Sequence, residues 1–554
     1  MKKIATKYLT IIVLMCTVVS CQDTPFLNQV PYSFTSPGNF YKTESDFKMA
    51  LNGCYEALNT YQITGNVWGP DGTYARGLYY ILEGCSDNVV SINSFYSSDF
   101  EKATYLPTSP NLKFFWQAYY MGISRCNYLL DNIESANISP SAKIQITAET
   151  RFMRAFYYQH LAECFGGVPL NTSSTPDNMA ARAPLSSVYE LIISDFDYAY
   201  KNLNSTGINK SSANKWTAGA YLGTAYNYLA SCKRYNVGVS LLAECPLNSF
   251  EWVNADSMSI KAVAVLSDVV NNSPYTLLPQ AQYSYLFREA TKAFQYQECL
   301  FLSEWSDDYA DSYSTNNELF TPNGSSIYAG SNGRHIPTVD LFKSYIVGDF
   351  RRDWNITGNF GTGVVKETVE KVEYYVPKLS SLGVPNNSQW YTGKFRLAIP
   401  GTYSAHGLNV SNSLNYPLMR LADVKLQLAE ALYFTKEEAS ARTILTEIRQ
   451  RVLDPAKPTV TITTLNTAYY KVDFVQELLD ERRRELCFES KRRIDLIRFD
   501  KTTSVIENLA LEGYSSVQTG TQTLKDNWKY YKIWLPIHQT EIDLNANLVK
   551  NAGW

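Results

Sequence analysis

The chain has 554 residues and a formal net charge of −3, and tyrosine is its commonest aromatic residue, with 41 Tyr against 25 Phe and 10 Trp. This length allows several ordinary domains or one large helical domain. The small net charge argues against a nucleic-acid-binding protein, since such proteins are usually basic on at least one face. Tyrosine at this frequency instead favours surfaces that combine apolar contact with hydrogen bonding.

The N-terminus has the pattern of an export signal. A lysine-containing start precedes an apolar run from Leu9 to Val19, which is shorter than the roughly 20 residues that a membrane-spanning helix needs. Ser20 and Cys21 follow, and a small residue directly before cysteine resembles a lipobox. We therefore predict a signal peptide over residues 1–20 and a lipidated Cys21, which anchors the protein without spanning the membrane. A plain secretory signal with an incidental cysteine is the alternative.

The first mature segment, residues 21–43, is rich in Pro, Ser, Thr and Asn, and we expect it to be a tether between the lipid and the first helix. Phe47, Leu51 and Leu58 then recur on one helical face. Between Tyr61 and Pro110 this periodicity gives way to Gly, Asn, Asp and Ser with many aromatic residues. We expect a first loop excursion there.

Several helices are predicted after this excursion. Residues 112–133 repeat apolar side chains at alternating three- and four-residue steps. Residues 148–165 carry a second apolar stripe, which the Gly166–Gly167 pair should end. Ser187 and Glu190 have the spacing of a capping box before a further apolar run. Four of the side chains in these helices are expected to be internal: Trp116 and Trp216 in the core, and Arg151 and Arg154 paired with carboxylates.

From about Pro274 to Asn415 the helical signal mostly disappears, and Gly, Ser, Asn and aromatic residues dominate. Within this region Val372, Tyr374 and Val376 alternate as they do in a strand. A structureless loop of this length is uncommon in a compact domain, so we expect a subdomain of short strands and turns. Segments of this kind often carry function.

Helical patterns resume over residues 416–432, and charge is then concentrated over Glu477–Phe499. Glu481, Glu485 and Glu489 recur there at every fourth residue, beside arginines that lie within i,i+3 and i,i+4 reach. Leucine and isoleucine residues between them supply an apolar surface for docking. One interpretation is an ordinary solvated helix with weak surface pairs. The other is a charged clamp inside a scaffold.

The stretch ERRRELCFESKRRIDLIRF, which begins at Glu481, resembles a signature near the C-terminus of the SusD/RagB family, the surface glycan-binding lipoproteins of Bacteroidota nutrient-uptake systems. Four other blocks of this chain resemble blocks of that family in the same order: WQAYYMGISRCNYLL, AETRFMRAFYYQHLAECFGGVPL, YPLMRLADVKLQLAEAL and ARTILTEIRQRV. The ending IWLPIHQTEIDLNANLVKNAGW also resembles the family, although His538 and Ala546 stand where proline is usual. The resemblance covers nearly the whole mature chain.

This resemblance implies a mainly α fold, in which tetratricopeptide-like helix pairs form a scaffold and a large irregular subdomain of loops and short strands carries the binding site. It also implies a non-catalytic cell-surface lipoprotein that captures an oligosaccharide and delivers it to a SusC-type TonB-dependent outer-membrane transporter. A peptide-binding receptor of the RagB type and a structural lid without ligand affinity are the alternatives. We expect a single domain over 44–554, with the scaffold in 44–272 and 416–554 and the irregular subdomain in about 273–415.

A sugar ring presents an apolar face that stacks on aromatic side chains and hydroxyl groups that need polar partners. Two loop regions have this composition, and the resemblance places the ligand site in the equivalent regions. Burial is the alternative for each aromatic residue, and burial of both Trp68 and Trp305 favours the structural lid. The candidates are Trp68, Asp71, Tyr74, Arg76, Tyr79, Asp87, Asn88 and Tyr96 in the first region, and Tyr283, Trp305, Tyr309, Tyr313 and Phe320 in the second.

The sequence offers little support for catalysis. Its four histidines form no HExxH motif, and it contains no G-x-S-x-G motif, so we expect no enzyme activity, cofactor or nucleic-acid partner. Asp307, Asp308 and Asp311 lie near Glu304, but they lack the spacing of a calcium loop. A carboxylate pair for glycoside cleavage is the other use of these acids. The eight cysteines that follow Cys21 show no metal-like spacing and are expected to be buried and unpaired.

Overall fold

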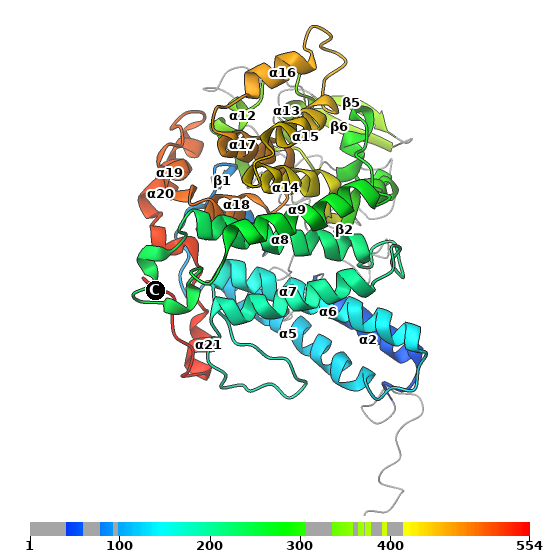
Figure 1. Cartoon of the computed structure of the whole chain (residues 1–554). Helices are drawn as coiled ribbons and strands as arrows, with labels where there is room; N and C mark the ends of the chain where they lie inside the picture. The colour runs from blue at the N-terminus through cyan, green and yellow to red at the C-terminus, as the bar shows by residue number, and fades with distance from the viewer. Residues whose placement is uncertain are drawn as a thin grey trace, which may run out of the picture.

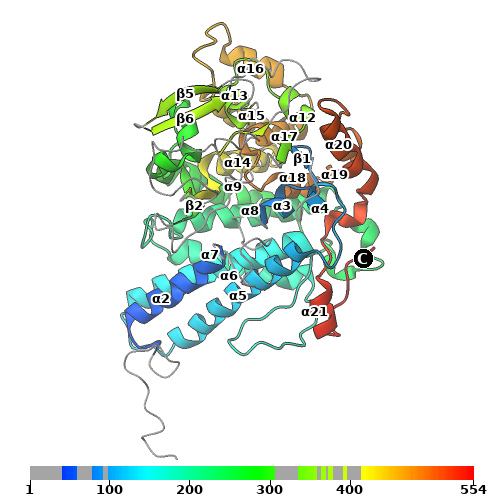
Figure 2. The ribbon, with the colours of Figure 1, turned by 180° about the vertical axis from the view of Figure 1, so that it is seen from behind.

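The computed structural model describes residues 40–58, 78–91, 98–305, 335–357, 364–369, 372–377, 391–395 and 414–554. Within these residues the molecule is a stack of helices with short strands and irregular segments packed against it (Figures 1 and 2). The prediction of a mainly α scaffold with an irregular part is therefore confirmed.

The first part of the stack follows chain order. Each helix packs against the one before it, and the last of them packs against α14 (Leu421–Phe434). Helices from the two ends of the chain therefore form one continuous stack (Figure 1). The helices of this first part are α2 (Glu44–Tyr55), α5 (Pro110–Ile133), α6 (Pro140–Phe165), α7 (Leu185–Asn202), α8 (Lys215–Arg234) and α9 (Ala255–Asn272).

The C-terminal helices complete the molecule. α15 (Glu438–Gln450) and α17 (Phe474–Leu486) both pack on α14. Figure 2 shows that α21 (Gln539–Leu544) lies at the end of the molecule opposite α16, close to α5. The remaining helices of this part are α16 (Ile462–Tyr469), α18 (Arg492–Arg498), α19 (Thr502–Glu507) and α20 (Ser515–Asn527).

Four antiparallel two-stranded ladders occur among the described residues. β5 (Val364–Val369) pairs with β6 (Val372–Pro377), which confirms the strand predicted from the alternation in this region. The short strands expected for this region are present, but short α-helices and 3₁₀ helices that were not predicted accompany them. The predicted boundaries at 273 and 415 stay predictions. The other pairs are β1 (Val89–Ser91) with β3 (His335–Pro337), β2 (Cys299–Ser303) with β8 (Tyr416–Arg420), and β4 (Ile356–Thr357) with β7 (Tyr391–Thr392).

Local sequence signals set some helix ends but not others. Gly166 ends α6 with a φ of 77°, and a Cβ at this position would lie 2.1 Å from Asn248 Oδ1, so both the turn and the close approach require glycine. The capping box predicted at Ser187 and Glu190 is wrong. α7 begins earlier, after Pro184, whose carbonyl accepts hydrogen bonds from the next turn. Ser187 and Glu190 therefore lie inside the helix.

Of the four side chains predicted to be internal, Trp116, Trp216 and Arg154 are buried, whereas Arg151 forms the predicted carboxylate pair with a side chain that is 32% exposed. Trp116 and Trp216 are 5% and 6% exposed. Arg154 Nε lies 2.8 Å from Asp195 Oδ2, and Arg151 Nε lies 3.4 Å from Oδ1 of the same carboxylate. The eight cysteines in the described part of the chain are all buried and unpaired, as expected.

The charged stretch Glu477–Phe499 is not one helix. α17 ends at Leu486, Phe488 and Ser490 adopt positive φ angles of 66° and 60°, and α18 starts at Arg492. The buried Glu83 carboxylate holds the turn between them, because it accepts hydrogen bonds from the backbone N–H groups of Phe488 (3.0 Å) and Ser490 (3.1 Å).

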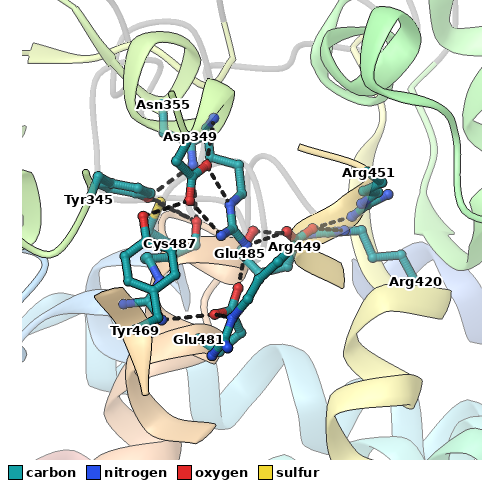
Figure 3. A network of polar contacts seen from close by, with 12 residues as sticks. Tyr345, Asp349, Asn355, Arg420, Arg449, Arg451, Tyr469, Glu481, Glu485 and Cys487 are labelled. Atoms are coloured by element: carbon teal, nitrogen blue, oxygen red, sulfur yellow. Dashed lines mark hydrogen bonds and ion pairs between the residues drawn. The ribbon is translucent and has the colours of Figure 1, made fainter. Parts of the chain in front are cut away.

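The acids of this stretch lie inside the protein, so the solvated-helix interpretation is wrong. Glu485 contacts Arg420 at 2.8 Å and Arg351 at 3.0 Å, and it also pairs with Arg451. Figure 3 shows Arg420 and Arg451 on one side of Glu485. We define the clamp as the buried group of Glu298, Arg351, Arg420, Arg449, Arg451, Glu481, Glu485 and Glu489.

The clamp fastens several separate segments to α17. Its arginines come from α13 (Phe350–Asn355), from the end of β8, and from α15 and the residue after it, while Glu298 ends α10 (Gln295–Glu298). Burial raises the pKa of Glu485, but Arg451, Arg420 and Arg351 outweigh it and hold the pKa at about 2. Removing one partner from such a group leaves a buried charge unpaired, which is strongly destabilising.

Candidate ligand-binding region

Three stretches within the two predicted loop regions are flanked by described elements that lie together. α3 (Leu78–Glu83) follows residues 59–77, β1 precedes residues 92–97, and β3 follows residues 306–334. In the β1–β3 ladder Ser91 stands opposite His335, and the Tyr79 ring meets the His335 ring edge-on at 5.3 Å. One end of each of these segments therefore joins the fold at the same place, which we call the base.

A buried polar cluster forms this base. Nδ1 of His335 faces Oε1 of Glu101, the last residue of α4 (Ser98–Glu101), and both side chains are buried. The centroid of the Tyr80 ring lies 4.8 Å from that of the His335 imidazole, so both Tyr79 and Tyr80 pack against His335. β1 ends just before residues 92–97, and α4 starts just after them. Both elements contact His335 of β3, β1 through Ser91 and α4 through Glu101.

Asp87 anchors the base to the C-terminal helices. Its two carboxylate oxygens accept hydrogen bonds from Arg492 Nε (2.7 Å) and Arg492 Nη2 (2.8 Å), and Arg483 Nε lies 3.3 Å from Oδ2. Burial raises the pKa of this carboxyl, but the two guanidinium groups outweigh it and bring the pKa to about 2. The carboxylate is thus ionised and already engaged by two arginines.

Asn88 acts in the same anchor. Its amide Nδ2 donates to Glu83 Oε1 at 2.6 Å, and its Oδ1 accepts from Arg483 Nε at 3.2 Å. Burial raises the pKa of Glu83 to about 7, against the lowering effect of the hydrogen bonds that it accepts. Glu83 therefore links Asn88 to the turn between α17 and α18.

The candidates of the second loop region that the structure describes are core residues. Tyr283 is fully buried, with its ring 5.5 Å from that of Phe287. Trp305 is 4% exposed, and its backbone N–H donates to Asn415 Oδ1 at 3.1 Å. Neither ring offers a face to solvent in this structure. Both residues therefore follow the alternative of burial that the sequence analysis gave for each aromatic residue.

The structure thus gives Tyr79, Asp87, Asn88, Tyr283 and Trp305 internal positions, and direct ligand contact by any of them stays a prediction. The other candidates lie outside the described residues. They are Trp68, Asp71, Tyr74, Arg76, Tyr96, Tyr309, Tyr313 and Phe320, together with the lipidation site Cys21.

The described residues hold no group of three or more His, Cys, Asp and Glu side chains that could bind a metal ion. The acidic residues Asp307, Asp308 and Asp311 lie outside them. In the same part of the chain, none of the helices is long and apolar enough to cross a membrane.

The residues that sequence reasoning missed are the remote partners of the charged stretch. Arg351 and Glu298 come from segments to which the sequence analysis gave no role, and Arg451 stood inside the family-like block ARTILTEIRQRV without being singled out. His335 and Glu101 are equally isolated in the sequence. Arg420 stood inside a family-like block, YPLMRLADV, and that block is the one sequence signal that pointed toward it.

Comparison with known proteins identifies the fold. A model of the SusD family matches residues 271–554, and a model described as "Starch-binding associating with outer membrane" matches residues 58–226. SusD-like protein P2 from Formosa agariphila is 24% identical over 98% of this chain and 98% of its own length. A solved SusD superfamily protein from Bacteroides vulgatus has a TM-score of 0.68 at 18% identity, covering 93% of this chain and 100% of that one. Surface glycan-binding protein A from Bacteroides thetaiotaomicron, solved with laminarihexaose, has a TM-score of 0.67 at 18% identity, covering 92% and 100%.

Proposed function

Because the chain belongs to the SusD family, we propose that it is a surface glycan-binding protein that captures an oligosaccharide without cleaving it. In this proposal a lipid on Cys21 holds the protein at the cell surface of the outer membrane, and the cargo passes to a SusC-type TonB-dependent transporter. The family description that links starch binding to the outer membrane supports this, as does the laminarihexaose complex of a structural relative.

The observation that carries the proposal is the shared base of the loops that contain the aromatic candidates. The Tyr79–His335 contact and the β1–β3 ladder bring together one described flank of each of the segments that contain Trp68, Tyr96 and Tyr309. Aromatic rings and polar side chains gathered at one place are what a pyranose needs for binding. Asp87 ties this place to α17 and α18 through Arg483 and Arg492, and such a preformed support lowers the ordering cost of binding.

The test is isothermal titration calorimetry of the protein that begins after Cys21, with a panel of plant, host and microbial glycans. We expect saturable binding to one glycan class and an affinity loss of at least about tenfold in Trp68→Ala, because aromatic anchors often contribute about 2 kcal/mol or more. Trp252→Ala is the matched control, since Trp252 is an exposed tryptophan (40%) just before α9. Equal losses in the two variants would contradict the proposed site.

A structural lid on the transporter is the second candidate. Burial of both Trp68 and Trp305 would favour it; Trp305 is buried, and Trp68 lies outside the described residues. In that case no glycan of the panel binds, and Trp68→Ala changes nothing.

A peptide receptor on the same scaffold is distinguished by titration with a peptide library, because it should bind extended peptides through backbone hydrogen bonds. Binding of a peptide without any glycan binding would replace the proposed cargo.

A further inference from the structure

A pocket of about 460 Å³ lies between α5, the segment 169–180 that follows α6, and α21 with the residues after it. Figure 2 shows α21 beside the long connection that follows α6, at the end of the molecule where α5 lies. The volume is within the range of about 300–1,000 Å³ that small-molecule sites occupy. The elements of this pocket differ from those that form the base of the candidate ligand-binding region.

Hydrogen bonds hold the walls of this pocket together. The Tyr120 hydroxyl donates to the carbonyl of Pro169 at 2.8 Å, and Asn127 Nδ2 donates to the carbonyl of Asn171, also at 2.8 Å. On the other side, Asn545 Nδ2 donates to the carbonyl of Ala180 at 2.9 Å. The pocket is therefore formed before any ligand enters, which lowers the cost of binding.

The apolar part of the lining suits the face of a sugar ring. Trp116 and Tyr120 lie one turn apart on α5, with ring centroids 4.9 Å apart. Trp116 is almost buried, so Tyr120 and the exposed rim residues Met179 (46%) and Leu544 (71%) provide the accessible surface. A flat ring such as that of Tyr120 packs against the C–H groups of a pyranose, and the Met179 and Leu544 side chains extend this apolar surface.

The polar part of the lining selects against anions. Ser124, Asn171 and Asn178 supply donors and acceptors for hydroxyl groups, whereas the amides of Asn127 and Asn545 already hold the walls. Among the described residues that line the pocket, the charged ones are Asp177 and Glu541, both acidic. Glu541 Oε1 accepts from Gln117 Nε2 at 3.2 Å, which holds the carboxylate at the rim. An anionic ligand would be repelled, whereas a neutral one rich in hydroxyl groups would find partners.

We propose that this pocket is a second saccharide-binding site, which takes a neutral oligosaccharide end or branch. The inference goes beyond the proposed function and does not depend on the loops of the candidate ligand-binding region. Two sites on one chain let a polysaccharide be held at two points, which raises its overall affinity.

The test uses laminarihexaose, maltohexaose and cellohexaose as neutral probes and a galacturonic acid hexamer as the anionic probe, with stoichiometry and affinity measured by calorimetry. The Trp68→Ala variant isolates the pocket, and we expect it to bind one equivalent of a neutral probe and not the anionic one. Adding Met179→Asp should weaken that binding at least tenfold, because it places a charge on the apolar rim. Ser124→Trp, which fills the pocket from α5, is the second variant, and Ser135→Trp, just after α5, is its control.

The two proposals fail in different ways in this experiment. If Trp68→Ala abolishes all binding and Met179→Asp has no effect, the second site is overturned and the proposed function stands. If Trp68→Ala has no effect and Met179→Asp with Ser124→Trp abolish binding, the pocket is a site and the loop site is overturned. The inference is overturned if the Trp68→Ala variant binds none of the neutral probes, or if it binds the anionic probe as tightly as a neutral one.

Discussion

Asp87 and Arg492 form a buried ion pair with hydrogen bonds of 2.7 and 2.8 Å, although 405 residues separate them in the sequence. The pair joins the first loop excursion to α18, next to the turn that Glu83 holds. It therefore connects the base of the candidate ligand-binding region to the most highly charged part of the scaffold.

Replacing Asp87 by Asn should lower the free energy of unfolding by about 3–5 kcal/mol, because Arg483 and Arg492 would remain buried without their counter-charge. Urea unfolding at pH 7 measures this change. Asp256→Asn is the matched control: Asp256 also pairs with an arginine at 2.7 Å, but its side chain is 86% exposed, so a loss of no more than about 1 kcal/mol is expected. Similar losses for both variants would show that burial of the pair contributes nothing.

The clamp should make the protein sensitive to acid. The pKa of Glu485 is about 2 in the folded state and 4.5 in its unperturbed state, so its contribution is complete above pH 4.5 and is lost as the pH falls toward 2. This contribution is at most about 3 kcal/mol. Glu485→Gln should be less stable than the original protein at pH 7 and should lose less stability between pH 4.5 and 2, as measured by urea unfolding at several pH values. Parallel pH curves for the two proteins would contradict this role.

Two glycines on helices allow a matched test of close packing. A Cβ at Gly122 on α5 would lie 2.5 Å from Cε2 of the buried Tyr157 ring, whereas a Cβ at Gly53 on α2 would meet nothing within 4 Å. Gly122→Ala should therefore destabilise the protein by about 1–3 kcal/mol despite the better helix propensity of alanine. Gly53→Ala should stabilise it by about 0.5–1 kcal/mol. Thermal unfolding of both variants gives the comparison, and the prediction fails if both changes have the same sign.

Periodicity predicted the helices because it is local. The stripes over 112–133 and 148–165 and the stop at Gly166 depend on residues within a few turns, and all three appear in the structure. The capping box at Ser187 failed for a local reason too, since Pro184 starts α7 one turn earlier.

The candidate region was harder to predict because its contacts are remote. Asp87 and Asn88 lie in a polar stretch whose composition predicts an exposed loop. The neighbouring residues in the sequence do not indicate that arginines from α17 and α18 cover them. The clamp shows the same limit. Glu481, Glu485 and Glu489 were recognised by their spacing. Glu298 was not, and Arg351 and Arg451 pair with these acids from segments whose approach only the fold determines.

Glu163, near the end of α6, should make the protein less stable as the pH rises. Its carboxyl is buried, accepts a hydrogen bond from Gln159 Nε2 at 2.8 Å, and has a pKa that burial raises to about 7. Lys491 and Arg498 lower this pKa and Asp495 raises it, but burial dominates. Folding therefore favours the protonated form, so the stabilisation is complete below pH 4.5 and is lost as the pH rises through 7.

Glu163→Gln keeps the shape of this side chain and an oxygen that can accept from Gln159, but it cannot ionise. The variant should match the original protein at pH 4.5 and exceed its stability at pH 8 by up to about 3 kcal/mol, measured by urea unfolding at the two pH values. Glu251→Gln is the control, because the Glu251 side chain is 66% exposed and pairs with Lys233 at the surface, so its effect should not change between these pH values. If Glu163→Gln destabilises the protein equally at both pH values, the carboxylate is ionised throughout and Lys491 and Arg498 outweigh its burial.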